Sequence, residues 1–236
     1  MKLTQEQIQQ LYAFTVKHYV EHYDLQTELV DHLANGIEQQ IQEKPEVTFK
    51  QALNKEFRKF GVHGFEDVIT KRKRAMALKY LKIIFGFFKS YFSYPKVLAT
   101  VTTIITVAVI FWNIEVDYKQ DIIFGIYAVI MLAIMFFAIK MKFKKTLKAN
   151  SKKWMLKEQI YDMGTIISFL NLLQILFIRP NIFGLNLELE QSNFYIDVFF
   201  AFIIVSVLLI GYIIIKIIPQ KAEELLTKTY PEYKFF

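Results

Sequence analysis

The hydrophobic and polar positions of this 236-residue chain follow two different patterns. Residues 1–79 are polar and charged, and their apolar side chains recur at the spacing of amphipathic helices. Residues 97–218 are dominated by Ile, Phe, Leu and Val, in long runs with few charges. The patterning therefore predicts an all-α protein in which a small helical bundle precedes a membrane module.

Four short helices are predicted within residues 1–79. Thr4 with Gln7, and Thr48 with Gln51, have the spacing of capping boxes, in which a hydroxyl and an amide satisfy the first N–H groups of a helix. The first helix is expected to continue to about His22, the second to run from Asp24 to about Gln42, and the fourth to begin near Phe65. The inward positions of the first three are expected to be Ile8, Leu11, Tyr12, Phe14, Val16 and Tyr19; Leu25, Leu29, Val30, Leu33, Ile37 and Ile41; and Phe49, Ala52, Leu53, Phe57 and Phe60.

Residues 80–96 form an aromatic connector that contains Lys82 and Lys89 and ends near Pro95. Aromatic and basic side chains together favour a helix lying at the membrane surface, although the segment could instead extend the first span.

Four apolar runs are predicted to form a four-helix transmembrane bundle within residues 97–219, at about 97–114, 122–139, 161–178 and 194–218, since each approaches the length needed to cross a core of roughly 30 Å. Residues 220–236 are then a cytoplasmic tail, whose aromatic end from Tyr230 is expected to return to the membrane surface or to the bundle.

Positive charge predicts the orientation of these spans. The loops after the first and third spans carry only Lys119 and Arg179, whereas the loop after the second span is rich in lysine. Because positive residues near span ends remain on the cytoplasmic side, we expect both termini in the cytoplasm and a multi-pass protein of the bacterial cytoplasmic membrane. The lysines expected to face anionic lipid headgroups are Lys140, Lys142, Lys144, Lys145, Lys148, Lys152 and Lys153. Trp154 and Met155 are expected along the membrane surface, and the loop could touch the amino-terminal bundle.

Composition excludes several classes of chemistry. The chain has no cysteine, so disulfides, thiolate catalysis and cysteine-based metal sites are excluded. The amino terminus lacks the apolar region of a cleavable signal peptide. The net charge of +7 lies mainly in lysine-rich patches beside apolar runs, which indicates membrane orientation, and no direct binding of nucleic acid is expected.

The side chains with the greatest chemical potential are Glu28, Asp31 and His32. Glu28 and His32 share a helix face at a spacing of four residues and could supply two metal ligands. His18 and His22 have the same spacing on the preceding helix. No third ligand completes either set, so packing or hydrogen bonding between helices is the simpler interpretation. Metal binding and a membrane enzyme using Glu28, Asp31 and His32 remain alternatives, but no catalytic motif is found and no cofactor is predicted.

Two amides interrupt the third apolar run. Asn171 and Gln174 are three residues apart and are expected to share one helix face. Polar side chains in a span usually bond to a neighbouring helix, so helix association within the bundle or a homodimer is the simpler interpretation. A polar path for a solute is the alternative. No ionisable residue lies at the centre of any predicted span, whereas ion carriers usually need one.

The segment from Tyr23 to Leu33, with its Glu28-Leu-Val-Asp31-His32 core, is followed by Thr48-Phe-Lys-Gln-Ala52 and by Phe60-Gly61. Over residues 20–75 this pattern resembles the bacterial HAAS signalling domain and related helical modules fused to multi-span membrane regions. The resemblance implies a protein-interaction role for Glu28, Asp31, His32, Phe60 and Gly61, and an association with regulators of the PadR type. Gln39 and Gln40 stand where that family often has an acidic helix end.

These observations predict a non-enzymatic membrane protein of regulatory, signalling or complex-subunit type. Its cytoplasmic helical module is expected to bind a protein partner or a second copy of the chain, through the exposed faces of residues 24–43 and 48–75. A small transporter or accessory permease subunit, using Asn171 and Gln174, is the alternative.

Overall fold

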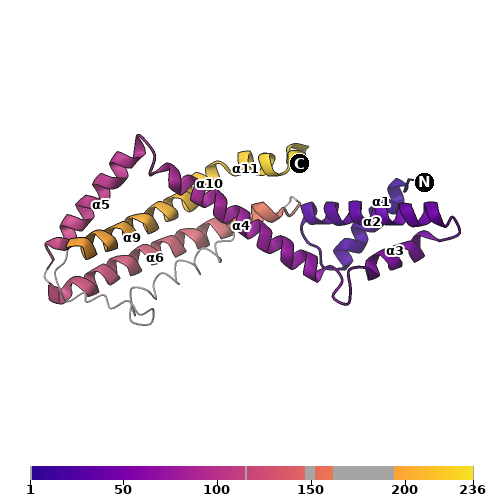
Figure 1. The fold of residues 1–236 in the computed structure, drawn as a ribbon, viewed down its shortest axis with the longest axis horizontal. Coiled ribbons are helices and arrows are strands. Elements are labelled where there is room, and N and C mark those ends of the chain that lie inside the picture. Colours follow the sequence, from indigo (N-terminus) through magenta and orange to yellow (C-terminus); the bar gives the residue numbers. More distant parts are fainter. Residues whose placement is uncertain (1, 115, 147–151, 162–193, 236) are drawn as a thin grey trace. The chain divides into compact units, whose positions relative to one another are not determined.

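A computed structural model describes residues 2–114, 116–146, 152–161 and 194–235 (Figure 1). All the regular elements in these ranges are helical, which confirms the predicted all-α class. The chain divides into two compact units. One, here the polar unit, comprises Met1–Lys79, Asn150–Gln159 and Leu226–Phe236; the other, here the apolar unit, comprises Tyr80–Ala149 and Ile160–Leu225.

The amino-terminal part of the polar unit contains α1 (Gln5–Lys17), α2 (Tyr23–Glu43), α3 (Phe49–Arg58) and the beginning of α4 (Glu66–Ser90). Both α1 and α3 pack against α2. The two predicted capping boxes are confirmed. The side-chain oxygens of Thr4 and Thr48 accept hydrogen bonds from the backbone N–H groups of Gln7 and Gln51, and the backbone N–H groups of the two threonines donate to the glutamine side chains in return. Gly61 has the predicted left-handed conformation, with φ of 81°.

The apolar stripe of α2 is largely as predicted. Five of its six expected positions are buried, namely Leu25, Leu29, Val30, Leu33 and Ile37. The prediction for the first helix is wrong beyond Lys17, because Tyr19 adopts φ of 63° and ends the helix. This turn buries Val20 and leaves Val16 and Tyr19 exposed. The exposed pair therefore does not belong to the core.

Gly36 allows α2 and α3 to approach closely. The Glu56 side chain from α3 is buried against it, and a β-carbon at position 36 would lie 2.5 Å from the Glu56 Cδ and Oε2 atoms. The carboxylate accepts hydrogen bonds from the Gln40 side chain and, at 2.6 Å, from Lys59 Nζ. A buried carboxylate is costly unless it is bonded in this way. The glycine therefore makes room for a satisfied buried acid.

We expect Gly36→Ala to destabilise the polar unit by about 1–3 kcal/mol, because displacing the Glu56 carboxylate outweighs the ~1 kcal/mol that alanine contributes inside a helix. The free energy of unfolding of the full chain in mild detergent measures the change. Gly86→Ala is the matched control, since Gly86 also lies inside a helix but has open space at its β-carbon. A stabilising effect at position 36 equal to that at position 86 would contradict the prediction.

The fourth helix and most of the predicted connector form one helix. α4 continues without interruption from Glu66 to Ser90, and the break falls between Ser90 and Lys96. The sequence pattern predicts a boundary between residues 79 and 80. The residues around it are mainly Lys, Arg, Ala, Leu and Met, which favour a continuous helix. The turn near Pro95 is as predicted.

The apolar unit contains α5 (Lys96–Trp112), α6 (Val116–Thr146) and α9 (Phe194–Tyr212). α9 contacts both α5 and α6, and Figure 1 shows it between them. Gly211 of α9 packs against the Ile134 side chain of α6. A β-carbon added at position 211 would lie 2.8 Å from that side chain. α9 continues through the π-helical turn Ile213–Ile217 into α10 (Ile218–Gln220). Pro219 lacks the N–H of a regular helix, which accounts for a local change of hydrogen-bond pattern there.

Of the described helices, one is long and apolar enough to cross a membrane: the continuous segment Phe194–Gln220, of 27 residues. Lys96–Trp112 and Asp121–Phe137 are shorter apolar helices. These three correspond to the fourth, first and second predicted runs respectively, whereas the third, at 161–178, lies outside the described residues. The described helices thus support one candidate span and not the predicted four-helix transmembrane bundle. The helix α6 also extends to Thr146, so the first part of the lysine run is helical and not a loop.

A buried ion pair joins α6 to α9. Lys119 Nζ lies 3.2 and 3.1 Å from the two carboxylate oxygens of Asp197, and both side chains are less than a tenth exposed. The charge at Lys119, which the sequence assigned to the loop after the first span, is thereby neutralised inside the unit. Charges buried in this way need close, well-aligned partners.

Candidate functional site

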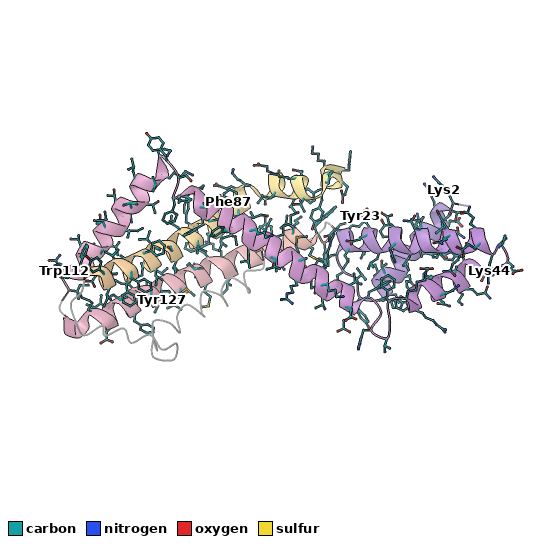
Figure 2. The ribbon with its side chains drawn as sticks, viewed as in Figure 1. Lys2, Tyr23, Lys44, Phe87, Trp112 and Tyr127 are labelled. Atoms are coloured by element: carbon teal, nitrogen blue, oxygen red, sulfur yellow. The ribbon has the colours of Figure 1, made fainter. Side chains whose placement is uncertain are left out.

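The candidate functional site is the region of the polar unit where three distant parts of the chain meet. The beginning of α2, the segment from Lys152 into α7 (Met155–Tyr161), and the tail containing α11 (Ala222–Thr229) and the 3₁₀ helix Pro231–Phe235 supply its residues. Tyr23, the first residue of α2, is labelled in Figure 2. Its backbone N–H donates to the Lys153 carbonyl at 2.8 Å.

The Asp24 carboxylate holds both incoming segments. One oxygen accepts from the Met155 backbone N–H at 3.2 Å, and the other accepts from the Tyr230 hydroxyl at 2.7 Å. The Tyr230 oxygen in turn accepts from the Leu156 N–H at 3.3 Å. The first N–H groups of a helix have no partner within it and favour negative charge. Asp24 and Tyr230 therefore cap α7 from outside the segment.

Trp154 forms the apolar centre of the site. Its side chain is 1% exposed, and its ring lies 5.3 Å from the Tyr23 ring, 4.9 Å from Tyr230 and 5.4 Å from Tyr233, between centroids. Lys152 Nζ lies 3.6 Å from the centroid of the Tyr23 ring, in a cation–π contact. Met155 and Leu156 are also buried. Burial of each such side chain stabilises a structure by roughly 1.5–3 kcal/mol relative to exposure.

An ion pair and a contact between a histidine and a carboxylate flank this apolar centre. Lys153 Nζ lies 2.7 Å from a Glu21 carboxylate oxygen, and His22 Nε2 contacts the Glu158 carboxylate. The hydrogen bond from Lys153 lowers the pKa of Glu21, and the same bond raises the pKa of Lys153. The Glu21–Lys153 pair is largely exposed, so it contributes orientation more than stability. The basic side chain of Lys153 thus meets the acidic side chain of Glu21, just before α2.

Tyr230 is neutral in this setting. Burial raises the pKa of its hydroxyl, and the neighbouring Asp24 carboxylate raises it further. The neutral hydroxyl is the form that can donate to Asp24. Its Oη also lies 4.0 Å from Met76 Sδ of α4, so the tail contacts a second helix of the unit.

These contacts revise the prediction for the lysine run. Trp154 and Met155 were expected along the membrane surface but are buried in the polar unit, because the rings of Tyr23 and Tyr230 and the Asp24 carboxylate receive them. The predicted contact between this segment and the amino-terminal helices is confirmed. The end of the tail lies against helices of the polar unit, where Tyr230 contacts Asp24 and Met76.

The sequence-predicted residues Glu28, Asp31 and His32 lie on an exposed part of α2. Glu28 pairs with Arg72 of α4 at 2.8 Å, and the His32 ring lies 5.6 Å from the Phe60 ring. Phe60 is itself part of a ring cluster with Phe57 and Phe65, and Gly61 begins the following turn. Two of the three side chains thus contact neighbouring helices or the turn beside them, and the role of the three residues stays a prediction.

His18 and His22 do not form the predicted helical pair. Since α1 ends at Lys17, the two residues lie on either side of the turn at Tyr19. His18 packs 4.5 Å from the Phe57 ring, whereas His22 contacts Glu158. Over the described ranges, no group of three or more His, Asp or Glu residues is arranged to hold a metal ion.

The remaining predicted residues are less fully defined. Asn171, Gln174 and Lys148 lie outside the described residues. Lys142, Lys144 and Lys145 belong to the end of α6, and Lys140 in the same helix is exposed. Lys152 and Lys153 are exposed and contact Tyr23 and Glu21.

The sequence pattern did not identify Asp24 or Tyr230 as site residues. Asp24 was noted only as the beginning of a helix, and Tyr230 only as part of an aromatic tail. A usable signal was present in the buried trio Trp154, Met155 and Leu156, which interrupts a strongly basic segment with apolar side chains. Such an interruption indicates a surface that receives it.

Comparison of the chain with protein-family models, curated proteins and solved structures finds no match. The resemblance of residues 20–75 to the HAAS domain therefore stays a prediction.

We expect Tyr230→Phe to release the tail, because it leaves an Asp24 oxygen and the Leu156 N–H without their partner, at a cost of about 1–3 kcal/mol. Denaturation of the full chain, followed by Trp154 fluorescence in a Trp112→Phe background, measures the loss. Since the folded-state pKa of Tyr230 is raised, its contribution is fully present below an ordinary tyrosine pKa of about 10 and is lost as the pH rises further.

Tyr233→Phe is the matched control, as it keeps its ring against Trp154 and removes a hydroxyl from the same tail. Equal stability of the Tyr230→Phe and Tyr233→Phe variants at pH 8 would show that the Asp24–Tyr230 bond contributes nothing.

Proposed function

We propose that this chain is a multi-pass protein of the bacterial cytoplasmic membrane, of regulatory, signalling or complex-subunit type. In this proposal the polar unit lies in the cytoplasm and binds a protein partner, and the apolar helices anchor it as part of a four-span bundle. The observation that carries the proposal is the meeting of three distant segments in one polar unit.

Those contacts constrain the number of membrane crossings. Met1–Lys79, Asn150–Gln159 and Leu226–Phe236 belong to one compact unit, so they must lie on the same side of any membrane that the chain crosses. The chain therefore crosses an even number of times between the first and second segments, and again between the second and third. α5 and α6 supply the first pair of crossings. Phe194–Gln220 and the apolar run at 161–178 would supply the second.

The surface of the apolar unit supports a lipid environment. Large apolar side chains are exposed on each of its three long helices, including Ile105 at 52%, Val129 at 66%, Phe136 at 62% and Leu208 at 47%. The interior is apolar as well, with Ile104, Tyr127 and Ile204 buried. A helix that is apolar on all sides is typical of a membrane span. α5, with 17 residues, is about 26 Å long at 1.5 Å per residue, close to the thickness of the bilayer core.

The construction of the polar unit supports a binding role. It already receives a short helix, α7, through buried apolar side chains flanked by opposite charges, the arrangement by which helical segments are recognised between proteins. It also takes in segments that enter and leave the apolar helices. A partner that binds the unit, or a change in the apolar helices, would then shift the same set of contacts.

The topology is tested by single cysteines, because the chain has none of its own. We expect a membrane-impermeant maleimide to label Asn113→Cys, beyond the end of α5, in intact cells. Gln5→Cys, Lys152→Cys and Lys234→Cys, all at exposed positions of the polar unit, should react only after permeabilisation. Labelling of any of these three from outside would contradict the proposal.

Binding is tested by purifying the tagged full chain in a gentle detergent after crosslinking in cells. We expect recovery of a protein partner or a second copy, and a loss of at least about fivefold when Asp24→Ala and Tyr230→Ala are combined, because an interface that includes the docked segments loses its shape. Ile105→Leu and Val129→Leu, on the exposed faces of α5 and α6, form the control pair. Recovery of the chain alone and as a monomer would count against the proposed function.

A further inference from the structure

A second concave surface lies on the polar unit, between α1 and α3. Its volume is about 320 Å³. Its apolar lining consists of Ala13 and Phe14 of α1 and of Phe49 and Leu53 of α3, and the neutral Gln10 of α1 also lines it. Both helices pack on α2, so the concavity is the outer groove of a three-helix arrangement. The Phe14 and Phe57 rings, 5.1 Å apart and perpendicular, also join α1 to α3. We call it the α1–α3 groove.

The charges that line this groove have a single sign. Lys17 stands on the α1 side and Lys50 on the α3 side, and both side chains are exposed. In the part of the chain that the structure describes, neither lysine takes part in an ion pair. The groove therefore combines an apolar floor with two basic edges.

The size of the groove limits what it can bind. A volume of 320 Å³ is at the lower end of the roughly 300–1,000 Å³ typical of small-molecule pockets, and exposed residues on both edges leave it open. It suits one or two large apolar side chains projecting from a larger partner. Grooves between two helices commonly receive a third helix, whose anchors recur at three- and four-residue intervals.

The contacts of α7 show how this unit binds a helix. There a basic segment, with Lys152 and Lys153, meets Glu21 and the beginning of α2 while Trp154 is buried. The α1–α3 groove has the opposite sign. Charge complementarity therefore excludes the chain's own lysine-rich segments from the groove and favours an acidic one.

We propose that the α1–α3 groove binds an amphipathic helix of a partner protein, with one or two large apolar anchors and acidic residues on both flanks. The anchors pack on Phe14, Phe49 and Leu53, and the acidic flanks pair with Lys17 and Lys50. This inference rests on the proposed function and assigns it a binding face and a class of partner.

The test uses two fluorescein-labelled helical peptides with the same leucine anchors, one flanked by glutamate and one by lysine. Fluorescence anisotropy with the full chain in neutral detergent should show the acidic peptide binding at least about tenfold more tightly. Lys17→Glu with Lys50→Glu should reverse that preference. Lys44→Glu with Lys55→Glu, which changes the net charge equally at exposed positions outside the groove, should leave it intact.

The apolar floor is tested separately by Ala13→Phe, which fills the groove, against Gln9→Phe, at an exposed position of α1 that does not line it. Ala13→Phe should abolish binding of the acidic peptide, and circular dichroism should show unchanged helix content.

Binding that is insensitive to the Lys17 and Lys50 changes would overturn the proposal. Displacement of the peptide by dihexanoyl phosphatidylglycerol, with binding of that lipid lost in the same variant, would identify a lipid site and overturn it too. If crosslinking still recovers a partner from the variant with Lys17→Glu and Lys50→Glu, the groove proposal fails while the proposed function stands.

Discussion

The polar unit depends on one carboxylate. Asp24 accepts hydrogen bonds from Met155, the first residue of α7, and from Tyr230 of the tail. These partners lie 131 and 206 positions further along the chain. Bonds to a charged group are roughly twice as strong as those between neutral groups. The carboxylate also compensates the unpaired N–H groups at the beginning of α7. Without it, the buried ring of Trp154 would still be attracted to the unit, but its orientation would not be fixed.

Local patterns predicted the local structure well. Thr4 and Thr48 begin helices because a capping box needs only residues three positions apart, and Leu25, Leu29 and Leu33 are buried because their spacing repeats with the helix. The exceptions have non-local causes. Tyr19 ends α1 early through a left-handed backbone that no apolar spacing signals. Trp154 is buried because of rings from Tyr23 and Tyr230, which only the folded chain brings together. The candidate site belongs to this second class.

Charge has a different role in each unit. In the apolar unit, Lys119 and Asp197 neutralise one another inside a bundle where an isolated charge would be costly. In the polar unit the charges remain near the surface and differ in sign from place to place: acidic at the beginning of α2, basic along the α1–α3 groove. Under the proposed function, such alternation would distinguish one binding segment from another at little cost in stability. The same residue types thus form a buried ion pair in one unit and separate surface patches of opposite sign in the other.

The position of Tyr230 has a consequence for the biosynthesis of the chain. A ribosome releases the amino-terminal helices first, yet the tail that contacts Asp24 and Met76 follows every helix of the apolar unit in sequence. The polar unit is therefore finished only after those helices have been made. Contacts between residues so far apart in sequence form slowly, so the beginning of α2 stays accessible to chaperones or proteases during synthesis. A chain cut short after the apolar helices would therefore lack the Tyr230 contacts to Asp24 and Met76, and its polar unit would stay incomplete.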